Sequence, residues 1–175
     1  MQQIASGKER NYLFDNMKVL LTFFMVSAHY IRISGSFDVS SFGGFFYIIA
    51  FSFIMQGFLF VSGYFSKNVD KCRLGAAKNF LLPYILLMPV MFVVRLGVFG
   101  DAAFDLLSPS HALWFLLVLF VYRFMIKDLE KVPGVLILSA GLLLASGCFS
   151  SLGRELALGR ICSFLFFFML GYKMK

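Results

Sequence analysis

The sequence has few charged residues and almost no histidine or tryptophan. Charged side chains make up 14% of its 175 residues, whereas 60% of the residues are hydrophobic. A soluble domain of this length could not hide so much apolar surface, so this composition excludes an ordinary soluble protein. We therefore predict an integral membrane protein whose residues 1–175 form a single membrane domain.

Cysteine and histidine are too scarce for a metal or redox motif. The three cysteines contain no Cys-x-x-Cys pair, and the two histidines are His29 and His111. We predict no metal site. Cys148 and Cys162 fall near the same predicted membrane surface, where they could form a disulfide or simply pack as small apolar residues. Phosphate-loop, dinucleotide-binding, zinc-protease and nucleophile-elbow motifs are also missing.

Basic residues exceed acidic ones, with a formal net charge of +7. In a soluble protein this excess would suggest a nucleic-acid partner. In a membrane protein it is explained by the concentration of Lys and Arg on the cytoplasmic side. We therefore predict contact with the lipid bilayer and no nucleic-acid partner.

Six hydrophobic segments predict an all-α, polytopic transmembrane helix bundle of about six helices. They cover residues 18–32, 42–65, 80–99, 111–125, 132–149 and 156–172. A cytoplasmic N-terminus places twelve basic residues inside and four outside, so both termini are predicted to be cytoplasmic. The outside set is Arg32, Arg95, Arg154 and Arg160. Trp114, at the outer end of its segment, fits an aromatic belt.

The first segment could also be interpreted as a signal peptide, because Val26-Ser27-Ala28 has small residues suited to cleavage. However, Glu9 and Asp15 lie in the preceding stretch, and several more hydrophobic segments follow. We expect the first helix to be retained.

Lys18 and His29 are the most informative pair in the sequence. Eleven residues of helix make about three turns, so the two side chains share one face roughly 16 Å apart along the axis. Ionisable groups deep in a membrane are costly and often mark a pathway or a reaction site. Asp15 could pair with Lys18, and burial beside Arg32 would favour a neutral, basic imidazole. Alternatively, His29 only hydrogen-bonds a neighbouring helix.

A second candidate region joins Ser62-Gly63 to a short basic loop. The small residues would let another backbone approach. The loop's basic residues, which could bind a polyphosphate or anionic lipid headgroups, are Lys67, Lys71, Arg73 and Lys78. Positive-inside bias alone would also explain this loop. Ser62 is not expected to act as a nucleophile, because no His or acid lies nearby in sequence.

Five short motifs follow one another along nearly the whole chain. They are Lys18 with His29 after ten intervening residues, Phe58-Leu-Phe-Val-Ser62-Gly63-Tyr64, Lys78-Asn-Phe-Leu-Leu-Pro83-Tyr84, Ala112-Leu-Trp114-Phe-Leu and Phe164-Leu-Phe-Phe-Phe-Met-Leu-Gly-Tyr172. In this order they resemble the acyltransferase 3 family of membrane-bound acyltransferases, particularly its fucose 4-O-acetylase-like branch. Members of the family are usually longer, so we expect this chain to correspond to the N-terminal part of the domain.

The resemblance implies transfer of an acyl group, usually acetyl from acetyl-CoA, to a hydroxyl of a sugar or cell-envelope glycan. His29 would then be the catalytic base or a transient acyl carrier. Residues implied to bind the donor are Lys18, Lys67, Arg73 and Lys78. Asp15, Arg32, Ser62, Gly63 and Trp114 would have supporting roles. The family's usual location implies a bacterial inner membrane.

Two other classes of function stay open at the sequence level. The chain could be a noncatalytic membrane protein, such as an inactive or truncated paralogue, a small transporter or a glycan-export partner. The basic loop could also bind anionic lipid without any preference for CoA.

Overall fold

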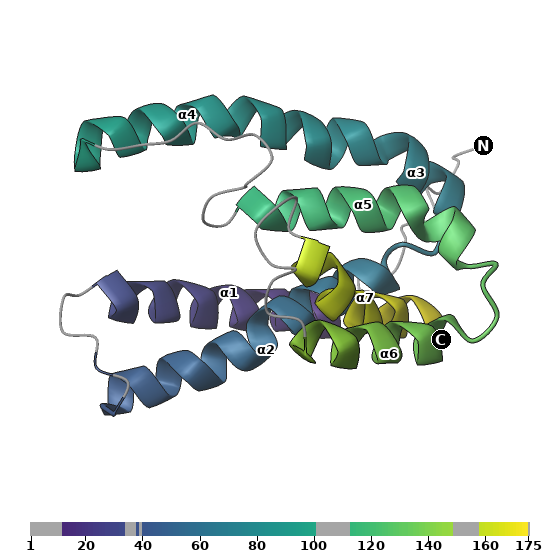
Figure 1. The fold of residues 1–175 in the computed structure, drawn as a ribbon, viewed down its shortest axis with the longest axis horizontal. Helices are drawn as coiled ribbons and strands as arrows, with labels where there is room; N and C mark the ends of the chain where they lie inside the picture. The colour runs from purple at the N-terminus through teal and green to yellow at the C-terminus, as the bar shows by residue number, and fades with distance from the viewer. Residues whose placement is uncertain (1–11, 34–37, 39, 101–112, 149–157, 175) are drawn as a thin grey trace, which may run out of the picture. The chain divides into compact units, whose positions relative to one another are not determined.

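Helices make up nearly all of the chain that the structure describes. The computed structural model describes residues 12–33, 38, 40–100, 113–148 and 158–174. Its elements are α1 (Tyr12–Ile33), α2 (Phe42–Tyr64), α3 (Val69–Ala76), the π-helical turn η1 (Ala77–Leu81), α4 (Leu82–Phe99), α5 (Leu113–Leu129), α6 (Val135–Cys148) and α7 (Leu158–Lys173). Because α3, η1 and α4 follow without a break, the described residues form six continuous helices (Figure 1).

The predicted all-α fold is thus confirmed for these residues, and each predicted segment coincides with one helix. His111 and Arg154 lie outside the described residues, as does the side chain of Cys148. Cys162 is a free thiol. By packing, the chain divides into two compact units, Met1–Val61 and Ser62–Lys175.

The first unit contains α1 and most of α2, which pack side by side (Figure 1). Ala28 is fully buried in this contact, together with Ala50 and Ile54 of α2. A Cβ at Gly57 would lie 2.9 Å from the Leu21 side chain, so the missing side chain lets α1 approach. Small residues therefore set the closeness of this helix pair.

The N-terminus of α2 is capped by the chain that precedes it. The Gly44 amide donates to Ser41 Oγ at 3.1 Å, and the Ser41 amide donates to the Asp38 carbonyl at 3.0 Å. Ser is a preferred N-cap residue because its oxygen accepts an otherwise unpaired amide. Hydrogen bonds from the Ser40 hydroxyl and amide lower the pKa of Asp38. These hydrogen bonds fix the start of α2.

The continuous helix of α3, η1 and α4 differs from one prediction. The segment from Lys67 to Lys78 was expected to be a loop, but most of it is α3. Asn68 caps this helix by accepting from the Lys71 amide at 3.1 Å, and no proline interrupts it before Pro83. Helical structure is therefore favoured at both its start and its interior, and the loop prediction was wrong.

The π-helical turn lies directly before Pro83. A proline inside a helix lacks an amide donor, and its ring clashes with the carbonyl four residues earlier. The wider turn of η1, over Ala77–Leu81, accommodates that defect where α3 continues into α4. The α4 helix then ends at Gly100, whose φ of 68° is the left-handed conformation that glycine adopts easily.

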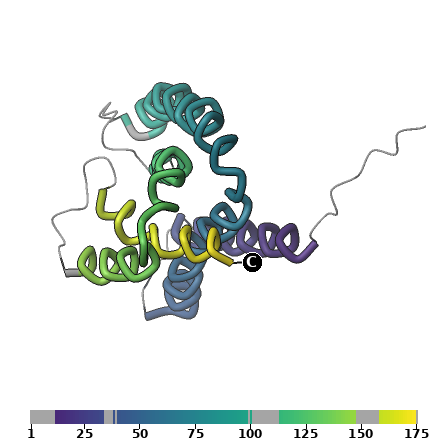
Figure 2. Tube along the Cα trace, turned by 90° about the vertical axis from the view of Figure 1, so that its right-hand side faces the viewer, coloured from purple at the N-terminus to yellow at the C-terminus, as the bar shows by residue number. Residues whose placement is uncertain are grey.

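The remaining helices of the second unit pack in pairs. The α5 helix lies along α3, η1 and α4, while α6 lies along α7 (Figure 1, Figure 2). Tyr84 and Met88 bury against Leu113 and Leu117 between α4 and α5. Ser146 and Ser163 share a 2.7 Å hydrogen bond between α6 and α7. Their polar groups are satisfied across a helix interface, as an apolar environment requires.

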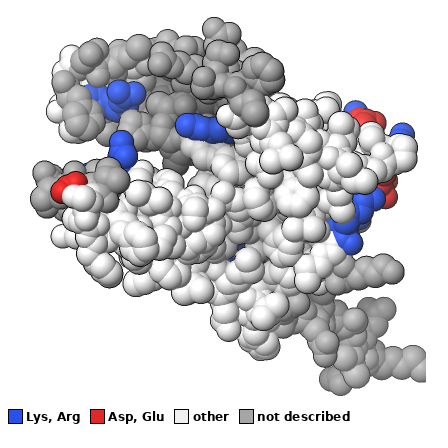
Figure 3. Space-filling model, turned by 60° about the horizontal axis from the view of Figure 1, so that its bottom comes forward, with Lys and Arg blue, Asp and Glu red and all other residues white. Residues whose placement is uncertain are grey.

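Two of the described helices are long and apolar enough to span a membrane. They are Phe42–Tyr64 and Val69–Val98, with mean hydropathies of 2.0 and 2.1. The described parts of α5, α6 and α7 are shorter, and α1 carries Asp15, Lys18 and Arg32. In the view of Figure 3, described atoms over most of the surface are uncharged. This surface suits contact with lipid.

Candidate functional site

One unbroken helix carries both Lys18 and His29. The α1 helix runs from Tyr12 to Ile33 without a kink residue, so the predicted common face is present. Lys18 Nζ lies 3.7 Å from Asp15 Oδ1, which confirms the predicted ion pair. The predicted alignment of a cation with an imidazole is therefore built into α1.

His29 lies at the edge of the face that α1 packs against α2. Its imidazole is exposed, with its ring centroid 5.4 Å from that of Phe51 in an edge-to-face arrangement. Ala28, the preceding residue, is fully buried. The stripe of Lys18 and His29 thus flanks the buried face of α1, and the burial expected for His29 beside Arg32 is not found among the described residues.

Arg32 is held by α2 at the other end of this stripe. Its NH1 donates to the Tyr47 hydroxyl at 3.2 Å, and its guanidinium lies 5.6 Å from the centre of the Tyr47 ring. The supporting role expected for Arg32 next to His29 stays a prediction.

Ser62 and Gly63 bring the end of α2 against the backbone of α7. A Cβ on Gly63 would overlap the carbonyl oxygen of Phe168 and lie 3.0 Å from the amide of Tyr172. Only glycine permits this approach, so the predicted backbone contact is confirmed. The same turn is sealed by Ser66, whose buried hydroxyl donates to the Ser62 carbonyl at 2.7 Å.

Lys67 binds the C-terminal end of α7. Its ammonium donates to the carbonyl oxygens of Tyr172 and Met174. It also lies 5.4 Å and 5.5 Å from the ring centres of Tyr64 and Tyr172. A cation is favourable at a helix C-terminus because the last carbonyls lack partners. Lys67 therefore already fastens α7, and its predicted donor-binding role is not tested by this geometry.

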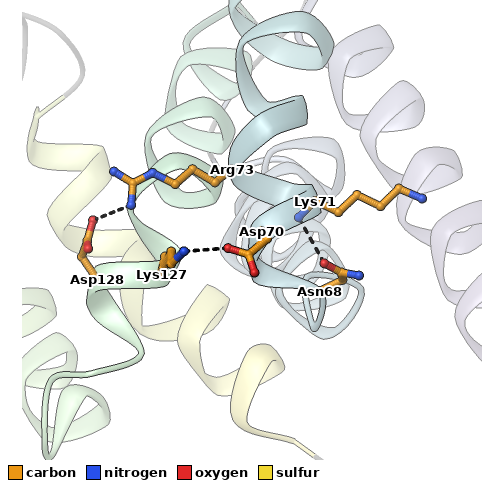
Figure 4. Close-up of polar contacts among 6 residues, drawn as sticks. All are labelled: Asn68, Asp70, Lys71, Arg73, Lys127 and Asp128. Carbon is orange, nitrogen blue, oxygen red and sulfur yellow. Dashed lines mark hydrogen bonds and ion pairs between the residues drawn. The ribbon is translucent and has the colours of Figure 1, made fainter.

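Two ion pairs join α3 to α5, as Figure 4 shows. Arg73 NH1 lies 3.2 Å from Asp128 Oδ2, and Lys127 Nζ lies 2.7 Å from Asp70 Oδ1. Arg73 also stacks over the Phe124 ring at 4.9 Å. These contacts neutralise Arg73 and Lys127. Lys71 points away from this cluster in Figure 4.

Lys78 lies in η1 and is exposed. In the described part of the chain no carboxylate is paired with it. Of the four predicted donor-binding residues, Lys67, Arg73 and Lys78 lie in the second unit and Lys18 in the first. Their joint action on one donor stays a prediction.

Arg123 is a residue that the sequence interpretation missed. It was counted only among the inner basic residues, although it lies inside the apolar helix α5. Its NH2 donates to Ser62 Oγ at 3.3 Å, and its guanidinium lies 5.0 Å from the centre of the Phe80 ring in η1. Its Nε is buried with no hydrogen-bond partner. A charge within an apolar run was the available signal.

Trp114 forms a cation–aromatic cluster at the first turn of α5. Arg160 of α7 lies 4.5 Å from the centre of its ring, and the Phe164 ring stacks on it at 5.7 Å and 19°. These contacts fasten α5 to α7. The supporting role predicted for Trp114 is compatible with this packing, but its contact with the membrane interface stays a prediction.

An open pocket of about 300 Å³ lies beside the end of α7. Its charged lining residues are Glu130, Lys131 and Lys173, and the turn at Pro133-Gly134 forms one wall. Within the described residues, no group of three or more His, Cys, Asp or Glu side chains could hold a metal ion.

The family model described as an acyltransferase domain (Acyl_transf_3) matches residues 11–175. The chain therefore belongs to the acyltransferase 3 family, a membrane-embedded family, as its ordered motifs predicted. No curated protein and no solved structure matches this chain.

Proposed function

We propose that this chain acts in a membrane-bound acyltransferase that moves an acetyl group from acetyl-CoA to a hydroxyl of a sugar or cell-envelope glycan. The observation that carries the proposal is the family match over nearly the whole chain. The unbroken α1 helix, with Lys18 and His29 on one face, supports the placement of the chemistry. His29 is the proposed catalytic residue.

The proposed step is an acyl transfer between two heteroatoms. His29 accepts the proton of the acceptor hydroxyl, and the oxygen attacks the thioester carbonyl carbon. The carbon–sulfur bond breaks, the thiolate leaves, and the imidazolium returns the proton to sulfur. As a transient acyl carrier, His29 would instead attack the thioester first and then release the acetyl group to the hydroxyl. Both routes need the imidazole nitrogen.

We further propose that all six helices cross a bacterial inner membrane, with both termini cytoplasmic. Basic residues at the inner surface would then hold the phosphates of CoA, because cations and phosphate oxygens form strong charge-assisted hydrogen bonds. The proposed donor-binding residues are Lys18, Lys67, Arg73 and Lys78. An acceptor glycan would meet the opposite end of the helices.

The test is the O-acetyl content of envelope glycans in cells that express the chain or a variant. His29→Ala should lower chain-dependent O-acetylation about 100-fold or more, because general acid–base catalysis contributes at least that much. Tyr30→Phe, at the exposed neighbour outside the stripe, is the matched control and should retain activity. Full O-acetylation by a well-expressed His29→Ala variant would refute the proposed role.

A further inference from the structure

Arg123 is a half-buried cation of the second unit that forms no ion pair among the described residues. Arg95 in α4 likewise has a buried Nε without a hydrogen-bond partner, but for Arg123 contacts from two other elements are also present. Arg73 has Asp128, Lys127 has Asp70, and Lys67 has the carbonyl oxygens of α7. The hydrogen-bond partner of Arg123 is a neutral hydroxyl, that of Ser62. A guanidinium has five N–H donors, so most of its capacity is unused among the described residues.

The position of Arg123 makes a charge without a negative partner costly in free energy. It lies in α5 about 9 Å along the helix from Leu129, one to two turns deeper than the ion pairs of Asp128 and Lys127. The side chain is half-buried and its Nε is sealed from solvent without an acceptor. A charge at such a place requires a counter-ion or marks a functional site.

Three elements converge on this guanidinium and orient it. Ser62 comes from the end of α2, Phe80 from η1, and Arg123 from α5. The π-helical turn places Phe80 so that its ring lies 5.0 Å from the guanidinium carbon. Single π turns in α-helices occur frequently at functional sites. A stacked guanidinium keeps its in-plane N–H groups available, since the ring covers only one face.

We propose that Arg123 binds a phosphate group of the acyl donor. This inference rests on the proposed function, which supplies a phosphate-bearing donor. The anion replaces the neutral Ser62 hydroxyl as the main acceptor, and two N–H groups of the guanidinium can bind two phosphate oxygens. Phe80 holds the guanidinium plane, and Ser62 holds the side chain in place while the site is empty. Arg123 is thus a binding residue and takes no part in bond breaking.

The test is ligand-induced thermal stabilisation of the purified chain in detergent. The probes are CoA, pantetheine, which lacks the phosphates, inorganic pyrophosphate and an anionic phospholipid. CoA and pyrophosphate should stabilise the wild-type chain and pantetheine should not. Arg123→Gln should weaken CoA binding about tenfold or more, because a charge-assisted hydrogen bond is lost. The affinity of Arg123→Lys for CoA should lie between those of the wild-type chain and Arg123→Gln, since an ammonium cannot form the bidentate contact.

Lys71→Gln is the charge-matched control, because it removes an exposed cation that points away from the ion-pair cluster. It should bind CoA as the wild-type chain does. If Arg123 only fastens helices, Arg123→Gln lowers the melting temperature of the ligand-free chain but leaves its shift with CoA unchanged. That result would overturn the inference while leaving the proposed function intact.

Other outcomes separate the two proposals. Pyrophosphate, but not CoA, could stabilise the wild-type chain, with this stabilisation lost in Arg123→Gln. That result would support a phosphate site and contradict the acetyl-CoA donor. An Arg123-dependent response only to anionic lipid would assign the site to a headgroup and overturn the donor assignment. No response of the wild-type chain to either phosphate probe would overturn both.

Discussion

At the scale of single residues, three ion pairs stand out in the described part of the chain. Lys18 pairs with Asp15, Arg73 with Asp128, and Lys127 with Asp70. All three pairs are at least partly exposed, so solvent screens the charges and each pair adds little to stability. Their main effect is therefore to orient side chains.

Sequence spacing predicted the local contacts within a helix and missed those between distant segments. The three-residue interval from Asp15 to Lys18 was sufficient to predict their ion pair. The contact of Arg123 with Ser62 joins residues 61 positions apart, and no local rule gives such a distance. The contact of Gly63 was predicted in part. A small residue indicates close packing, but it does not show that the partner lies on α7.

Gly63 offers the sharpest stability prediction. Gly63→Ala places a methyl group on the carbonyl of Phe168, which is backbone and cannot rotate away. Overpacking of this kind costs about 1–3 kcal/mol. We expect a clear drop in the thermal unfolding midpoint of the purified chain in detergent.

Gly141→Ala in α6 is the matched control, because nothing lies within 4 Å of the added methyl group. Alanine favours a helix over glycine by about 1 kcal/mol, so this variant should be neutral or slightly more stable. Equal midpoints for the two alanine variants would show that α2 and α7 do not meet at Gly63.

At the scale of helices, hydrophobic runs predicted the apolar helices, but they did not predict the charged helix α3. Apolar content correctly identified the spans of α2 and α4. It also led to a loop where α3 forms, because Lys71, Arg73 and Asp70 interrupt the apolar pattern. The α3 helix is instead stabilised by its Asn68 cap and by packing on α5, and tertiary packing is not visible in a local window.

The position of α3 relative to the membrane gives a test of topology. With the native cysteines replaced by serine, Lys71→Cys in α3 and Ser40→Cys before α2 each place one exposed thiol. A membrane-impermeant maleimide should label the Ser40 variant in intact cells, and the Lys71 variant only after permeabilisation. Positive-inside topology requires these opposite sides. Labelling of both thiols from the same side would contradict it.

At the scale of the whole chain, two compact units share one family match. The first unit carries Lys18 and His29. The second carries the two ion pairs between α3 and α5, the contact of Lys67 with the end of α7, and the guanidinium of Arg123. The ordered motifs predicted the family because they are collinear over nearly the whole length. The resemblance implied an acceptor class, but the identity of the sugar could not be predicted, since no contact among the described residues carries information about it.

The proposed function assigns chemistry to α1 and donor binding to both units. In that proposal, His29 supplies the nitrogen that moves the proton or carries the acetyl group. In the same proposal, Lys18 and the second-unit residues Lys67, Arg73, Lys78 and Arg123 supply the charge that CoA phosphates require. The proposed function therefore requires both a donor-dependent reaction and its loss when the imidazole of His29 is removed.

The most direct measurement is the transfer of labelled acetyl from acetyl-CoA in isolated membranes. Membranes that contain the chain should move label into envelope glycan faster than membranes without it. Membranes with His29→Ala, at equal protein level, should fall to the rate without the chain. Transfer that His29→Ala leaves unchanged, or the lack of any chain-dependent transfer, would contradict the account.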